Sequence, residues 1–204
     1  MTPTSVLLVP LPEAEPVIDR YRRRLDPTGR QGMPAHVTVL VPFVPPSLLD
    51  GAVVAELAAL FAAVPPFEYV LRRTGWFESR VLFLAPEPAE PFRRLTFAVA
   101  ERFPQYRPYE GAFADVVPHV TVGEGGRVRR RRWRMRWAAG QLAGMAPIRA
   151  TATEVWLMEL DPARARWERR ERFRLLGAPD VTSGNGTGDA TVASGMDRAA
   201  RAAD

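Results

Sequence analysis

The chain has 204 residues, of which 47% are hydrophobic, enough to bury the core of one large domain or of two small lobes that share a core. It contains no cysteine, which excludes disulfide bonds and thiolate-bound metal as sources of stability. The formal net charge is +5 at pH 7 and every basic residue is arginine. These charges either attract phosphate groups modestly or form a solvated basic surface.

The N-terminal sequence MTPTSVLLVPL lacks the features of a secretory signal, because it has no basic start and Pro10 interrupts its apolar run. No apolar stretch reaches the length of about 18 residues that a membrane helix needs. Together with the absence of cysteine, these features lead us to expect a cytoplasmic protein without a membrane segment.

Apolar periodicity in the first half predicts a strand, a helix, a strand, a helix and two further strands. The strands are expected at 5–11, 35–43, 67–77 and 80–84, and the helices at 12–24 and 47–64. Ser47 is the expected N-cap of the second helix.

The second half repeats this order, except that its opening strand is either 80–84 or one lent by the neighbouring hairpin. Helices are expected at 89–103 and 127–144, and strands at 118–123, 148–160 and 165–176. We therefore expect one duplicated α+β domain over residues 1–177, with lobes at about 1–78 and 79–177. Residues 178–204 lack aromatic residues and apolar periodicity, which predicts a disordered tail.

The only two histidines stand in the same four-residue phrase, HVTV, at His36 and again at His119. Side chains alternate between the faces of a strand, so each imidazole shares a face with the threonine two residues later, Thr38 or Thr121. The valines then lie on the opposite face and are expected to pack against helices.

One HVTV phrase is typical of any amphipathic strand, but the pair is not. With ordinary usage of Val and Thr, three matching residues after the second histidine arise by chance on the order of once in a thousand. The copies also occupy corresponding places in the two halves. If a pseudo-twofold axis relates these halves, the two His-Thr faces converge on one cleft.

Two imidazoles can act as a base and an acid near neutral pH, and two hydroxyls can donate hydrogen bonds to phosphate oxygens. This set favours displacement at phosphorus. Metal ligation is a weaker alternative, since two histidines without cysteine or an associated carboxylate cluster make a thin ligand shell. A Ser-His-Asp triad lacks its GxSxG context and leaves one histidine unexplained.

The two motifs, His36-Val37-Thr38-Val39 and His119-Val120-Thr121-Val122, resemble those of the 2H phosphoesterase superfamily, in its 2′-5′ RNA ligase and cyclic phosphodiesterase branch. The segments HVTVLVPF and VLFLAPEPAEPFRRLTFAVAERFPQYRPYEGAFADVVPHVTVGE are also similar to this family. The resemblance covers about residues 5–176. It implies a duplicated two-lobed fold in which antiparallel sheets line a central cleft and helices lie outside.

The resemblance further implies that His36 and His119 are the acid/base pair and that Thr38 and Thr121 hold the phosphate. The implied reaction is metal-independent opening of a 2′,3′-cyclic phosphate on an RNA end or a nucleotide, with no cofactor. Run in reverse, the same site joins RNA ends by a 2′-5′ bond. We expect a monomer. The alternative is a module that binds a nucleotide or RNA in this cleft without turnover.

Three further residues are candidates for substrate binding: Phe77 and Tyr106 by stacking a base, and Arg80 by contacting phosphate. Ordinary packing and a charge at a hairpin end are the alternatives. The run RVRRRRWRMRW is either an RNA-binding patch or an outer helix with buried Trp133 and Trp137 rings and solvated arginines. Its expected position outside the cleft favours the second interpretation.

Overall fold

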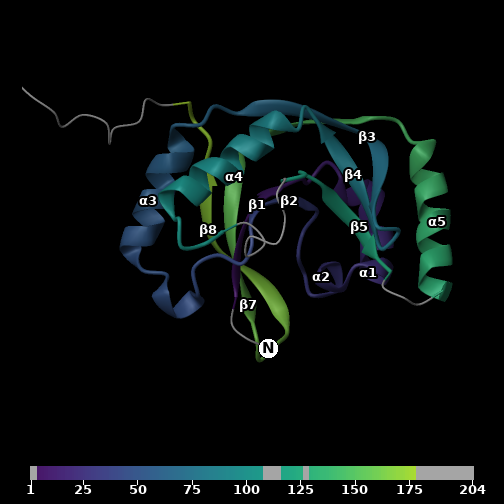
Figure 1. Ribbon diagram of the computed structural model, residues 1–204, viewed down its shortest axis with the longest axis horizontal. Coiled ribbons are helices and arrows are strands. Elements are labelled where there is room, and N and C mark those ends of the chain that lie inside the picture. The colour runs from purple at the N-terminus through teal and green to yellow at the C-terminus, as the bar shows by residue number, and fades with distance from the viewer. Residues whose placement is uncertain (1–3, 108–115, 126–128, 178–204) are drawn as a thin grey trace, which may run out of the picture.

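The computed structural model describes residues 4–107, 116–125 and 129–177, so the predicted disordered tail at 178–204 lies outside the described residues. The fold is α+β, with two four-stranded antiparallel sheets and helices around them, as Figure 1 shows. The fold class expected from the sequence is therefore confirmed.

Each sheet has one HVTV strand at its edge. The first sheet has the order β2-β1-β7-β8 and the second the order β5-β4-β3-β6. The strands of the first are β1 (Ser5–Pro10), β2 (His36–Leu40), β7 (Glu154–Asp161) and β8 (Arg166–Arg174). Those of the second are β3 (Phe67–Phe77), β4 (Val81–Glu87), β5 (Val120–Glu124) and β6 (Ile148–Ala152).

The sheets do not follow the expected division into lobes at 1–78 and 79–177. The first sheet combines the first two strands of the chain with the last two, and the second sheet takes the four strands between them. Residues 78 and 79 lie in the turn between β3 and β4, two paired strands of one sheet. The two-sheet symmetry is thus present, but its halves are not consecutive in sequence.

The single strand expected over 148–160 is in fact two strands in different sheets. β6 pairs with β3, whereas β7 pairs with β1, and the chain crosses between the sheets at Thr153. Local alternation gives no sign of this crossing, because pairing partners far along the chain determine it.

The helices are α1 (Glu15–Leu25), α2 (Pro27–Arg30), α3 (Gly51–Ala62), α4 (Glu90–Arg102) and α5 (Arg129–Ala143), with a 3₁₀ turn at Pro46–Leu48. The N-cap expected at Ser47 is wrong. Ser47 lies inside the 3₁₀ turn, and Asp50 caps α3 instead, its Oδ1 accepting a hydrogen bond of 2.9 Å from the Val53 amide.

Two helices connect the sheets in matching ways. α1 follows β1 but packs against β5 of the other sheet, and α4 follows β4 but packs against β2. One hydrophobic core contains Val37, Val39, Val120 and Val122, each at most 3% exposed. The expectation that the valines of both HVTV phrases face the core is therefore confirmed.

Helix α5 lies on the outside, beside the β3–β4–β5 edge of the molecule in Figure 1. Its buried residues are Met135, Ala138 and Leu142. The expectation that its tryptophans are buried is wrong: Trp133 is 66% and Trp137 53% exposed, although the Trp137 ring lies 6.1 Å from that of Tyr21 on α1. No helix within the described ranges is long and apolar enough to cross a bilayer.

Candidate active site

The two histidines lie on the edge strands where the sheets approach each other. His36 opens β2, His119 directly precedes β5, and these two strands are in contact. The two HVTV phrases, 83 positions apart in sequence, thus come together at one place.

Both imidazoles are held in the same way. Nδ1 of His36 lies 2.7 Å from the Pro34 carbonyl oxygen, and Nδ1 of His119 lies 2.8 Å from that of Val117. A carbonyl only accepts hydrogen bonds, so Nδ1 carries the hydrogen in both rings. In each neutral ring Nε2 is therefore the free base, available to a substrate.

The threonines share the histidine faces. Thr38 and Thr121 are partly exposed, whereas the valines beside them are buried. Thr38 pairs with Leu8 on β1 and Thr121 with Phe83 on β4. Each hydroxyl therefore stands on an edge strand two residues from an imidazole, in the arrangement that the strand period predicts.

Burial lowers the pKa of both imidazoles. Desolvation and then the positive charge of Arg22 lower the pKa of His36 to about 4, against weaker opposing effects of the Pro34 hydrogen bond and Asp26. Desolvation also lowers the pKa of His119, with the Val117 hydrogen bond opposing it. Only His36 has an arginine among the causes of its shift.

A buried ion pair on α1 accounts for this difference. Arg22 and Asp26 are each 2% exposed, with Nη2 and Oδ2 2.9 Å apart. Asp26 also caps α2 by accepting from the amide and the hydroxyl of Thr28. Glu15 accepts a hydrogen bond from the Ala35 amide, next to His36, and lies 3.9 Å from Arg22. This network was not predicted from the sequence, although the Asp-Pro-Thr segment is a recognisable signal for a helix N-cap at Asp26.

An aromatic pair supports His119. The Phe77 ring lies edge-on to the imidazole, with centroids 4.9 Å apart, and stacks on Phe83 at 4.4 Å. Phe83 is itself 5.6 Å from the imidazole. The sequence analysis named Phe77 but missed Phe83 and the glycine beneath it, Gly75. The structure therefore brings Phe77 to the histidine.

Arg80 and Tyr106 have other surroundings. Arg80 ends the β3–β4 turn, its guanidinium 3.8 Å from Glu78 and its carbonyl accepting from the Gly125 amide. The Tyr106 ring packs against Phe43, with centroids 5.6 Å apart, next to the main core. Arg80 thus lies near the hairpin tip that carries Phe77, and Tyr106 lies against the core residue that follows β2.

The face of the first sheet that carries Thr38 has a small apolar cluster of its own. It includes Leu8 and Met158, with Trp156 packed against it. The Arg169 guanidinium stacks over the Trp156 ring at 4.5 Å. In the described segments, no group of three or more His, Asp or Glu residues is arranged to hold a metal ion.

Several solved structures share this fold. Escherichia coli LigT complexed with NADP⁺ superposes with a TM-score of 0.53 at 19% sequence identity, covering 86% of this chain and 99% of LigT. TT0787 of Thermus thermophilus gives 0.57 at 22% identity, covering 85% and 98%. A structure described as a phosphoesterase gives 0.52 at 18% identity, covering 84% and 98%. These similarities establish the two-sheet fold.

Comparison with curated proteins gave no match. The family model described as the 2′-5′ RNA ligase superfamily matches residues 9–164, a range that contains both HVTV phrases and most of both sheets. The chain belongs to the 2′-5′ RNA ligase superfamily.

Proposed function

We propose that this protein is a phosphoesterase that opens 2′,3′-cyclic phosphates, on RNA ends or on small nucleotides, by acid/base catalysis without a metal ion. The observation that carries the proposal is the matched pair of imidazoles. Each donates through Nδ1 to the carbonyl two residues earlier, which leaves both Nε2 atoms for the substrate. Each also shares its strand face with a threonine hydroxyl.

Hydrolysis in this site requires two proton transfers. One imidazole takes a proton from water as the water oxygen bonds to phosphorus. The bond between phosphorus and the ribose 3′ oxygen breaks, and the second imidazole, protonated at the start, gives its proton to that oxygen. The product is a 2′-phosphate with a free 3′-hydroxyl. Thr38 and Thr121 donate hydrogen bonds to the non-bridging oxygens, whose charge grows in the transition state.

The surroundings of the two rings favour one assignment of roles. Arg22 disfavours a positive charge on His36, and no arginine is among the causes of the shift at His119. His36 is therefore the ring more readily neutral and serves as the base, and His119 serves as the acid. In the reverse direction the roles exchange. When the 5′-hydroxyl of a second RNA replaces water in the opening direction, it bonds to phosphorus, the bond to the 3′ oxygen breaks as before, and the two RNA ends are joined by a 2′-5′ bond.

The family and its structural neighbours support a nucleotide substrate. The matching family model is named for RNA ligation. The E. coli LigT structures include complexes with 3′-AMP and with ATP, so that protein binds adenine nucleotides. The aromatic pair of Phe77 and Phe83 beside His119 offers a surface against which a base or ribose can pack.

Turnover in EDTA tests the proposal. The substrates are 2′,3′-cyclic AMP and a short RNA that ends in a 2′,3′-cyclic phosphate, with products identified by chromatography. We expect 2′-phosphate products, and we expect Ala substitution of His36 or His119 to abolish turnover in a protein that stays folded. A folded wild-type protein that binds these compounds but turns over neither would replace the proposal with a binding role.

A further inference from the structure

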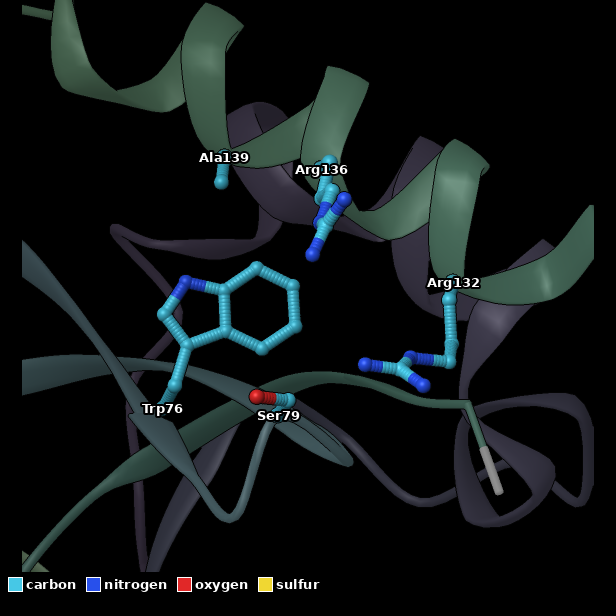
Figure 2. A pocket seen from close by; sticks show the side chains of 5 residues that line it. All are labelled: Trp76, Ser79, Arg132, Arg136 and Ala139. Atoms are coloured by element: carbon cyan, nitrogen blue, oxygen red, sulfur yellow. The ribbon is translucent and has the colours of Figure 1, made fainter. Parts of the chain in front are cut away.

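A pocket with a volume of about 320 Å³ lies between helix α5 and the β3–β4 hairpin. In Figure 2, Trp76 and Ser79 line it from the hairpin, while Arg132, Arg136 and Ala139 line it from the helix. Its volume is near the lower end of the range for small-ligand sites, about 300–1,000 Å³. It is separate from the site formed by the two histidines.

Two arginines line the helical side of this pocket. Arg132 and Arg136 are one helical turn apart, and Figure 2 shows both guanidinium groups directed toward the hairpin. Like charges at this spacing destabilise a helix. All ion pairs found within residues 4–107, 116–125 and 129–177 belong to other arginines. Guanidinium groups that face one pocket and pair with no carboxylate among these residues are suited to bind the oxygens of a phosphate group in a bidentate manner.

The rest of α5 favours the same ligand. Residues 129–143 include six arginines and no acidic residue, and four of the arginines fill the first turn, where the helix dipole is already positive. Trp133 is exposed, whereas the Trp137 ring, although about half exposed, lies against Tyr21 of α1 with centroids 6.1 Å apart. Arg131 has a structural role, since its Nη2 donates a hydrogen bond of 2.9 Å to the Leu25 carbonyl oxygen at the end of α1. The positive charge of the helix favours an anionic ligand, such as a nucleic acid strand, at the pocket that Arg132 and Arg136 line.

The pocket and the candidate active site lie at the same hairpin. Phe77 contacts the His119 ring, and its neighbour Trp76 lines the pocket. Adjacent residues of a strand project from opposite faces of the sheet. The candidate site and the pocket therefore lie on the two faces of one hairpin near its tip, where Ser79 lines the pocket and Arg80 is exposed. An RNA whose cyclic phosphate lies at the histidines would reach the pocket by passing around this hairpin tip.

We propose that this pocket binds the single-stranded RNA that leads to the cyclic phosphate, with Arg132 and Arg136 on a backbone phosphate and a base against Trp76. This inference rests on the proposed function and narrows it: the substrates are RNA ends rather than free cyclic nucleotides. The ligand is recognised through its backbone and by stacking, so the pocket tolerates different sequences.

Binding tests the pocket independently of catalysis. The probe is a fluorescent ten-nucleotide RNA that ends in a 2′-phosphate, the expected unreactive product. We expect the Arg132→Gln/Arg136→Gln protein to bind it at least about tenfold more weakly than wild type, with a salt slope smaller by about 0.7 for the one phosphate that the two arginines neutralise. Arg130→Gln/Arg134→Gln is the matched control, because it removes the same charge from the same helix at exposed positions outside the pocket.

Turnover then separates RNA-sized from nucleotide-sized substrates. For the Arg132→Gln/Arg136→Gln protein we expect kcat/KM to fall about tenfold on RNA ending in a cyclic phosphate and to stay unchanged on 2′,3′-cyclic AMP. Equal RNA affinity in the pocket and control variants, or an equal fall on both substrates, overturns the inference. If wild type turns over neither substrate the proposed function fails, and the binding measurement still decides whether the pocket holds RNA.

Discussion

Phe83 lies across Gly75 on the neighbouring strand, so close that a β-carbon at position 75 would be 2.3 Å from Cζ of the ring. Phe77 stacks on this ring, and both aromatic rings contact His119. The missing side chain at Gly75 therefore gives Phe83 the space from which the pair of rings supports the imidazole.

We predict that Gly75→Ala displaces Phe83 and, through Phe77, shifts His119. The added methyl group should cost about 1–3 kcal/mol of stability, as overpacking does, and lower kcat/KM by about 10-fold to 100-fold. Denaturant unfolding and steady-state kinetics measure the two effects. Gly140→Ala is the control, because a β-carbon at this position of α5 would have no neighbouring atom within 4 Å, and the change should gain about 0.5–1 kcal/mol. Wild-type activity in Gly75→Ala would show that the aromatic pair does not position His119.

The histidine titrations make a second prediction. The protein has two histidines, so NMR gives two imidazole signals, which a His36→Gln variant assigns. We expect His36 to titrate with a pKa of about 4 and His119 below the ordinary value of 6.5. The acid limb of kcat/KM should then follow His36, and the activity should fall as the pH rises through the pKa of His119. A pKa at or above 6.5 for both rings would contradict this account.

Stability should depend on pH through the same groups. The folded-state pKa of His36 lies below that of the unfolded chain, so its contribution is fully present above pH 6.5 and is lost as the pH falls toward 4. The loss is up to about 3 kcal/mol at 1.36 kcal/mol per pKa unit. The free energy of unfolding should therefore depend on pH in the same way for wild type and His36→Gln above pH 6.5, and more steeply for wild type below it. Parallel curves between pH 4 and 7 would exclude a depressed pKa at His36.

A third prediction concerns the ion pair on α1. Asp26→Asn leaves the buried Arg22 charge without its partner, which should cost about 3–5 kcal/mol. Because Asp26 raises the pKa of His36 and Arg22 lowers it, Asp26→Asn should lower that pKa further and Arg22→Met should raise it. Opposite shifts of the His36 signal on NMR titration would verify this. Shifts in the same direction would mean that the pair acts on His36 through structure rather than charge.

The threonine hydroxyls make a fourth prediction. Thr38→Val and Thr121→Val keep the shape of the side chain but remove the donor to phosphate, and each should lower kcat by about 100-fold to 1,000-fold. Thr38→Ser and Thr121→Ser retain a hydroxyl and should keep most of the activity. Valine variants as active as the serine variants would indicate that the hydroxyls do not contact the transition state.

Much of the fold follows from local sequence patterns. Alternation gives β3 with the bounds Phe67–Phe77, and apolar spacing gives helices α1, α4 and α5 to within a few residues. The crossing at Thr153 and the assignment of β6 and β7 to different sheets do not follow, because distant pairing partners decide them. The cap of α3 was expected at Ser47 since the 3₁₀ turn before Asp50 has no separate signal.

Some residues of the candidate site can likewise be predicted from the sequence, and others cannot. The repeated HVTV phrase identifies four residues because strand periodicity alone places His and Thr on one face. Phe83 could not be found without the register of the β3–β4 hairpin, since a slip of one residue moves every side chain to the other face. Arg22 lies on a helix that follows β1 of the first sheet in sequence, and its influence on His36 depends on how α1 packs against β5 of the second sheet.

The most direct test of the central claim is the rate of cyclic phosphate opening in EDTA by wild type, His36→Ala, His119→Ala and the double variant. If the two rings act as one acid/base device, each single substitution should lower the rate by about 100-fold to 10,000-fold, and the double variant should be hardly slower than either single one. Wild-type turnover that disappears in EDTA, or a histidine whose loss leaves the rate unchanged, would contradict the account.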